Sequence, residues 1–204
     1  ETLAHLSTRV PRFDEATLEL DGYPSLSEPP VLFDILERTD DTVTVRHLYG
    51  EVTIPRNPQR IVAAYGSAEA LITLGFDPIA YPAWDDVPPV LREQAPDIEW
   101  LRIADTTPNL EAIAALEPDL IIDWNAWMGG GGAAADYERV SQIAPTLVAY
   151  TFPVYWQSYL TQLGELFDRN EEAEAAIADY DARSGAFRSE ASQSITPDET
   201  VTPL

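Results

Sequence analysis

The sequence contains no cysteine and no lysine, because arginine supplies all 12 of its basic residues. Without cysteine, the chain forms no disulfide bond and offers no thiolate ligand to zinc or to an iron–sulfur cluster. Without lysine, a Walker phosphate loop is excluded, so the glycine run at 129–132 is interpreted as a flexible loop at the mouth of a cleft. No run of about 18 apolar residues is present, so the sequence predicts no membrane-spanning helix.

Positive charge is also scarce, since 35 acidic residues give the chain a net charge of −23. An acidic surface repels phosphate backbones, so we do not expect nucleic acid as a partner. The first thirty residues carry acidic side chains and lack the apolar segment of an intact secretion signal. A mature chain whose signal or lipid anchor has been removed would show the same pattern.

Residues 1–40 are interrupted by proline and predict an N-terminal arm or linker. Within them, "ATLELDGYP" predicts a strand and a turn, and "PPVLFDILERTDD" predicts a short helix. From residue 42 the pattern becomes regular. "TVTVRHLYGEVTIP" alternates on both sides of Gly50-Glu51, which predicts a β-hairpin.

Apolar segments then alternate with helical segments, which is typical of a parallel sheet. We expect strands within 60–66, 77–84, 99–107, 119–127 and 146–152, and helices within 67–75, 108–118, 133–145 and 155–168. Because each strand is almost continuously apolar, both faces of the sheet should be covered. The sequence therefore predicts an α/β fold, with a Rossmann-like parallel sheet covered by helices on both faces.

A long helix should follow this sheet. Its apolar positions alternate at spacings of four and three, which gives a narrow stripe along one face: Ala173, Ile177, Tyr180, Ser184, Phe187 and Ala191. The predicted organisation is thus an arm or linker at 1–40, an α/β ligand-binding lobe at 41–170, a long connecting helix at 171–192 and a tail at 193–204.

Aromatic residues gather where the expected strands end. In a doubly wound sheet, ligands bind at the carboxyl ends of the strands. The aromatic residues there are Tyr65, Tyr81, Trp84, Trp124, Trp127, Phe152 and Tyr155. Large amphipathic rings suit a concave binding surface. The alternative is that several of these rings fold inward as part of the core.

Catalytic chemistry has little support in the sequence. The two histidines, His5 and His47, lie far along the chain from the strand ends. Ser67 lacks the flanking glycines of a nucleophile elbow. Near the strand ends, Asp105 and the pair Asp85-Asp86 are too few to form a transition-metal site. We therefore expect no enzyme activity, no resident metal and no cofactor.

Three blocks carry a resemblance: "YGEVTIPRNPQRIVAAYGSAEALITLGFDPIAY", "PNLEAIAALEPDLIID" and "APTLVAY". Together they resemble the periplasmic-binding-protein family that serves ABC importers of iron–siderophores, haem and cobalamin. The resemblance covers about residues 42–192, and "NLEAIAALEPDLII" is its most specific part. It implies a two-lobed protein with the ligand held between the lobes. This chain would be the N-terminal lobe plus the connecting helix, with the second lobe absent and supplied by a dimer or by a partner fragment.

The resemblance also implies roles for individual residues. The ligand-facing positions would be Tyr65, Tyr81, Trp84, Asp105, Trp124 and Trp127, to which the last strand end adds Tyr155. Glu111 would dock on arginines of a membrane permease. The alternative for Glu111 is a carboxylate that only stabilises the first turn of its helix. The implied location is extracytoplasmic, either periplasmic or lipid-anchored at the cell surface.

The expected ligand is a small iron chelate, specifically a ferric siderophore. A hydroxamate-like complex is favoured, because the acidic, lysine-free chain offers little positive charge to an anionic catecholate complex. Haem and cobalamin remain alternatives. A further alternative is a single lobe reused as a sensor or a protein-interaction module, without a role in transport.

Overall fold

A computed structural model describes residues 31–63, 67–83, 86–103, 109–122, 133–149 and 155–194, without the side chains of 133–136 and 191–194. The chain divides into two compact units, Glu1–Val31 and Leu32–Leu204, and the second is described below. The strand and turn predicted within "ATLELDGYP" lie outside the described residues.

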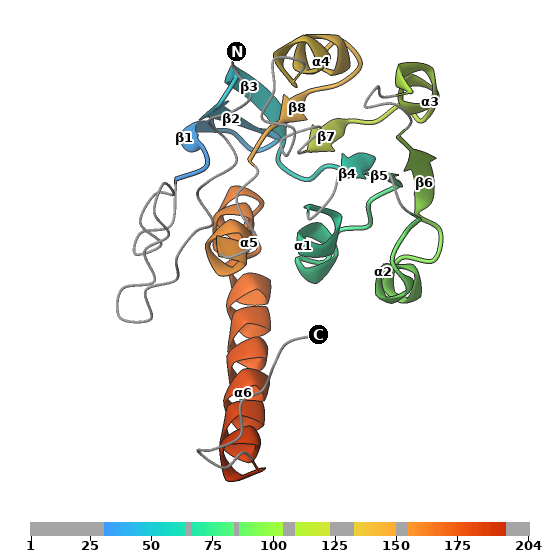
Figure 1. Cartoon of the computed structure of the whole chain (residues 1–204). Coiled ribbons are helices and arrows are strands. Elements are labelled where there is room, and N and C mark those ends of the chain that lie inside the picture. Colours follow the sequence, from blue (N-terminus) through green and yellow to red (C-terminus); the bar gives the residue numbers. More distant parts are fainter. Residues whose placement is uncertain are drawn as a thin grey trace, which may run out of the picture. The chain divides into compact units, whose positions relative to one another are not determined.

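Five parallel strands form the central sheet in the order β6-β5-β4-β7-β8 (Figure 1). Their bounds are β4 Ile61–Ala63, β5 Ala80–Ala83, β6 Glu99–Arg102, β7 Leu120–Ile122 and β8 Thr146–Leu147. The chain moves outward from β4 to β6 and then returns to place β7 beside β4. This reversal makes the boundary between β4 and β7 the topological switch point of the sheet.

Helices cover both faces of this sheet, as predicted. Their bounds are α1 Ser67–Thr73, α2 Pro89–Gln94, α3 Leu110–Ala115, α4 Ala133–Val140 and α5 Trp156–Leu166. Leu120 and Ile122 of β7 join the core cluster that contains residues of α1, α2 and α5, whereas Ile121 joins a second cluster with residues of α3 and α4. In Figure 1 these two groups of helices lie on opposite sides of the strands. The predicted α/β class is therefore confirmed, and α2 is a helix that the sequence analysis did not anticipate.

Helix α1 ends where glycine was expected to stop it. Gly75 has a φ of +84°, and its amide donates to the carbonyl of Ile72 while the amide of Phe76 donates to the carbonyl of Leu71. This pair of bonds is a Schellman motif, which favours glycine at its left-handed position. The chain is thereby redirected from α1 toward β5.

A second sheet contains β1 Asp34–Arg38, β2 Thr42–His47 and β3 Gly50–Pro55, all antiparallel. The predicted hairpin is confirmed, but its turn is at Leu48 and Tyr49 rather than at Gly50-Glu51, because His47 pairs with Gly50. The inward-facing side chains of this sheet belong to the larger core cluster: Val43, Val45 and Ile54.

The short helix predicted within "PPVLFDILERTDD" is wrong, since its residues form strand β1. Ile35 pairs with Val45 and Arg38 pairs with Val43, with a bulge between Ile35 and Glu37. Hydrogen bonding to β2 here outweighs the local helical spacing of the apolar residues. The compact unit therefore begins at Leu32, before the predicted boundary at residue 41.

The predicted long helix is present as α6, Asn170–Ser194. Its first turns pack on α5: Ala173 is buried, and the ring of Tyr180 meets that of Trp156 at 4.6 Å between centroids. Beyond Tyr180 the apolar stripe is largely exposed, as Phe187 with 71% of its surface exposed shows. Across the part of the chain that the structure describes, no helix combines the length and apolar character needed to cross a bilayer.

Candidate ligand-binding site

The strand order of the central sheet reverses between β4 and β7, so its switch point lies at the carboxyl ends of these two strands. Ligands of open α/β sheets bind in the crevice at this position. The chain leaves these strands after Ala63 and Ile122. Five predicted ligand contacts lie outside the described residues and stay predictions: Tyr65, Trp84, Asp105, Trp124 and Trp127.

The two other predicted contacts are described, and both are buried. Tyr81 lies in β5 with 1% of its surface exposed, and Tyr155 lies immediately before α5 with 8% exposed. Tyr81 belongs to the larger core cluster. The structure thus places both rings inside the lobe, as in the alternative where aromatic residues fold inward. A contact of either ring with ligand stays a prediction and would require the ring to become accessible.

Trp100 is an aromatic residue of this region that the sequence analysis did not select. It is half-buried in β6, pairs with Tyr81 of β5, and donates from Nε1 to the carbonyl of Ala83 at 3.2 Å. Ala83 is the last residue of β5, so the indole is tied to the carboxyl end of that strand. The sequence could have indicated Trp100, because side chains alternate along a strand and "EWLR" therefore places Trp100 on the same face as Arg102.

A second group of rings joins segments far apart in the sequence. The His47 cluster consists of His47 at the end of β2, Tyr49 in the hairpin turn and Tyr137 in α4. The rings of Tyr49 and Tyr137 stack at 4.5 Å with an interplanar angle of 16°. The hydroxyl of Tyr137 is hydrogen-bonded to Nε2 of His47 at 3.2 Å. His47 was not expected to take part in a site because it lies far along the chain from the strand ends, and the structure instead places it against Tyr137, 90 residues away in sequence.

Burial controls the titration of this cluster. His47 is 7% exposed, and its Nδ1 has no hydrogen-bond partner among the described residues. Desolvation lowers the pKa of His47 and raises the pKa of Tyr137. Both shifts favour the uncharged side chain, as expected for polar groups that are removed from water without an opposite charge beside them.

Glu111 lies in the first turn of α3, and its side chain is exposed. The helix is capped by Asn109, whose side chain accepts a hydrogen bond from the amide of Ala112 at 3.0 Å. At the other end, the guanidinium of Arg60 donates to the carbonyls of Leu116 and Glu117. Since Asn109 performs the capping, the carboxylate of Glu111 is left available on the surface of a well-anchored helix. Its docking role stays a prediction.

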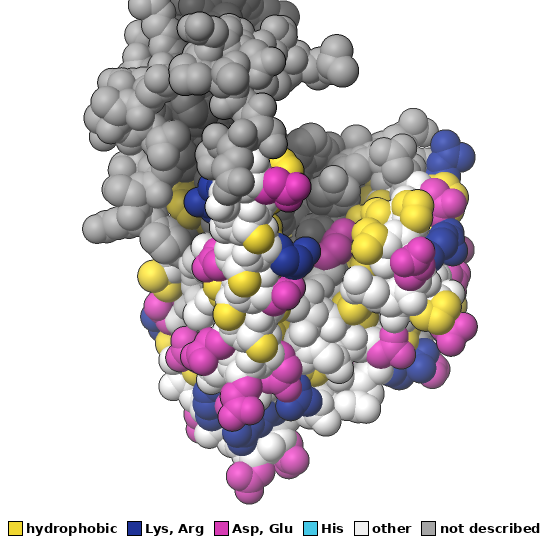
Figure 2. All heavy atoms as spheres, turned by 90° about the horizontal axis from the view of Figure 1, so that it is seen from below, with side chains coloured by type: hydrophobic (Ala, Val, Ile, Leu, Met, Phe, Trp, Pro, Cys, Tyr) yellow, Lys and Arg dark blue, Asp and Glu magenta, His cyan; other side chains and the backbone are white. Residues whose placement is uncertain are grey.

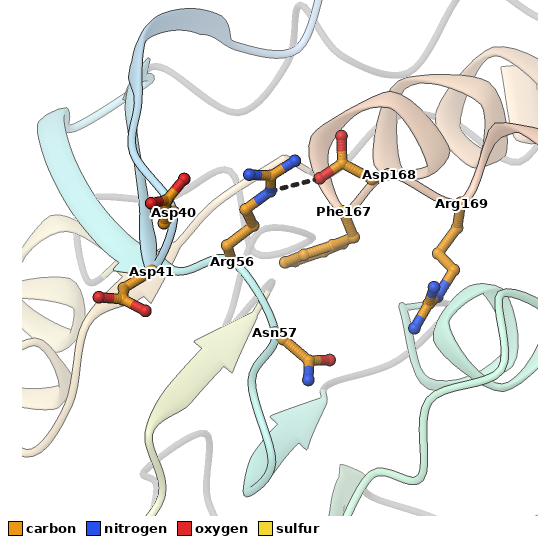
Figure 3. A pocket seen from close by; sticks show the side chains of 7 residues that line it. All are labelled: Asp40, Asp41, Arg56, Asn57, Phe167, Asp168 and Arg169. Atoms are coloured by element: carbon orange, nitrogen blue, oxygen red, sulfur yellow. Dashed lines mark hydrogen bonds and ion pairs between the residues drawn. The ribbon is translucent and has the colours of Figure 1, made fainter.

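A pocket lies at the opposite end of the sheet, before β4 (Figure 3). Its volume is about 460 Å³, and it is lined by Asp40, Asp41, Arg56, Asn57, Phe167, Asp168 and Arg169. Arg56 donates from Nε to Asp168 at 2.6 Å, which lowers the pKa of that carboxyl group. Arg38 donates to the carbonyls of Glu165 and Leu166 at the end of α5. These bonds tie the α5–α6 junction to the antiparallel sheet.

The surface around these elements mixes both signs of charge. Figure 2 shows acidic side chains and arginines side by side, with hydrophobic side chains between them. Ion pairs include Arg92 with Asp86 and Arg183 with Asp179. Within the described residues, no group of three His, Asp or Glu side chains is placed to hold a metal ion.

Comparison with known proteins gives consistent matches. The family model described as periplasmic binding protein matches residues 61–203. The chain is 34% identical over 149 residues to the probable siderophore-binding lipoprotein YfiY of Bacillus subtilis, covering 70% of this chain and 43% of that protein. It is 33% identical over 149 residues to the ferric enterobactin-binding periplasmic protein FepB of Escherichia coli, covering 68% of this chain and 46% of that one.

A solved structure matches a similar share of the chain. The periplasmic solute binding protein of Mycobacterium smegmatis superposes with a TM-score of 0.58 and 32% identity, over 76% of this chain and 56% of that one. The chain therefore spans about half the length of the relatives that it matches.

Proposed function

Because the chain belongs to the periplasmic binding protein family, as its resemblance predicted, we propose that it binds a ferric siderophore as the solute-binding part of an ABC importer. The observation that carries the proposal is the similarity to proteins named for binding siderophores, over most of the described lobe. The doubly wound sheet supports it, since this architecture provides a ligand crevice at its switch point. The function is binding and delivery, without catalysis, in an extracytoplasmic location.

The α/β lobe would supply one side of such a site. The chain spans about half the length of its relatives, and one concave surface buries a ligand less completely than two surfaces closing on it. The other side would come from a second lobe or a second copy. We favour a hydroxamate-like complex as ligand, because a chain with a net charge of −23 and no lysine offers little attraction to an anionic catecholate complex.

The first test is a titration of the intrinsic tryptophan fluorescence with ferric hydroxamates, ferric catecholates, haem and cobalamin, with light scattering for the oligomeric state. We expect saturable quenching by a ferric hydroxamate. The double substitution of Trp124 and Trp127 with alanine should abolish it, because large rings supply most of the contact area. Trp156→Phe is the control, since its ring contacts Tyr180 between α5 and α6 and should leave binding unchanged.

The outcomes of this titration separate the alternatives. If only haem or cobalamin quenches the fluorescence, that compound and not a ferric siderophore would be the ligand. No response from a folded chain would contradict a binding role for this lobe and favour a sensor or an interaction module. Loss of the folded circular dichroism spectrum in the double variant would show that Trp124 and Trp127 belong to the core.

Delivery to a permease is tested separately at Glu111. Glu111→Gln should leave ligand binding unchanged and weaken association with the permease at least tenfold, because an exposed carboxylate on an anchored helix can pair with arginine of a partner. Glu117→Gln is the control, because Glu117 is also exposed and lies just beyond the C-terminal end of α3. Equal association of both variants with the permease, measured in proteoliposomes, would remove Glu111 from the interface.

A further inference from the structure

We propose that the His47 cluster is a pH-sensitive latch, which holds the β2–β3 hairpin on helix α4 while His47 is neutral and releases it when His47 is protonated. The latch joins two separate elements, since His47 and Tyr137 are 90 residues apart in sequence. It does not depend on which ligand the lobe binds.

The rings of the cluster form a contact between the β2–β3 hairpin and helix α4. Tyr49 stacks on Tyr137, and the ring of His47 meets that of Tyr137 edge-on at 5.5 Å between centroids. The neighbouring turn residue Leu48 is 76% exposed. The turn therefore contributes its tyrosine to the contact with α4 and leaves its leucine in water, so the contact at the turn depends on the orientation of the aromatic rings.

The hydrogen bond of His47 is suited to the neutral ring. A neutral imidazole has one N–H and one bare nitrogen, and the Tyr137 hydroxyl can serve either form at Nε2. Protonation places an N–H on both nitrogens, and the described part of the chain offers the buried Nδ1 no acceptor. A buried charge with an unsatisfied donor is strongly disfavoured. The imidazolium ion is therefore accommodated only when the ring reaches water.

The charged groups described near the ring do not offset this cost. On the hairpin, Arg46 pairs with Glu51 at 2.8 Å, and both side chains are exposed, on the opposite side of the strands from His47. On α4, the neighbours Glu138 and Arg139 are also exposed. Tyr137 stays neutral, because burial raises its pKa. Within the described residues, neither nitrogen of His47 is hydrogen-bonded to a carboxylate.

The direction of the pH dependence follows from these contacts. Burial lowers the pKa of His47 below the ordinary histidine value of about 6.5. The latched state is thus fully stable above about pH 6.5 and loses stability as the pH falls below that value, where the released ring binds a proton more readily than the latched one. Acidification should therefore free the hairpin tip from α4 before the lobe unfolds.

The test uses nuclear magnetic resonance of the full chain between pH 8 and pH 4.5. We follow the ring protons of His47 together with the ring resonances of Tyr49 and Tyr137, whose stacking produces ring-current shifts. The expected result is one shared transition with a midpoint below 6.5, in which the ring-current shifts of both tyrosines disappear. In His47→Phe, which keeps an aromatic ring, the tyrosine resonances should show no transition.

Two outcomes would overturn the latch. One is a His47 titration at or above pH 6.5 while the tyrosine shifts stay constant. The other is an unchanged tyrosine transition in His47→Phe. Glu51→Gln is the control, because it removes a neighbouring titratable group on the exposed face and should leave the transition in place. If His47→Phe does not fold, the wild-type titration still decides, since it reports the charge of His47 and the stacking of the tyrosines in one sample.

Discussion

Replacing Ile121 or Ile122 with alanine should lower the free energy of unfolding by about 2–5 kcal/mol in each case. Both side chains are completely buried in β7, but they face opposite sides of the sheet and belong to different core clusters. A loss of this size is a large fraction of the roughly 5–15 kcal/mol that stabilises a typical domain. Chemical denaturation followed by circular dichroism measures both variants.

Comparing the two variants tests whether helices cover both faces of the sheet. A sheet covered on one face alone would show a large loss for one isoleucine and a small one for its neighbour. Val90→Ala on α2 is the control, because Val90 is 59% exposed and its truncation should change stability by no more than about 0.5 kcal/mol. A small effect of Ile121→Ala would contradict the packing of α3 and α4 against the second face.

Gly164→Ala should lower the free energy of unfolding by about 1–3 kcal/mol, although alanine favours helices more than glycine does. A Cβ at this position of α5 would lie 2.9 Å from the Cβ of Ala173 and 3.0 Å from the carbonyl oxygen of Arg169. The second of these atoms belongs to the backbone, which cannot rotate away. The substitution should therefore push α6 away from α5, which thermal and urea denaturation would register.

Gly185→Ala is the matched control for this prediction. Gly185 lies in α6, and an added Cβ would meet no described atom within 4 Å other than its chain neighbours and the backbone of its own helix, so its replacement should raise stability by up to about 1 kcal/mol. The double variant Gly164→Ala with Ala173→Gly removes the closer of the two contacts and should recover part of the loss. A stabilising effect of Gly164→Ala alone would show that the two helices are not in close contact.

Much of the fold was predictable because its parallel strands are short and apolar, and helices with clear stops separate them. Gly75 illustrates this, since its left-handed backbone ends α1 where the sequence predicted. β1 was not predictable in the same way. Its apolar residues have helical spacing, and only pairing with β2, which is a tertiary interaction, fixes it as a strand. Local patterns contain no information about such partners.

The candidate site was less predictable than the fold. The topology locates the crevice, but exposure of a side chain depends on packing that the sequence does not specify. Tyr81 and Tyr155 follow the predicted placement along the chain and are nevertheless buried. His47 was set aside for its distance in sequence from the strand ends, and the structure brings it to within hydrogen-bonding distance of Tyr137. Chain distance is a poor guide wherever a hairpin folds back on a helix.

The α5–α6 junction gives the long helix the properties of a lever. Arg56 and Arg38 hold Asp168 at the start of a helix of 25 residues, which is about 37 Å long. A rotation of only about 5° at this fulcrum would move the far end by roughly 3 Å, given that length. A small rearrangement at this junction is thus amplified along α6, whose angle depends on these ion pairs together with the packing of its first turns on α5.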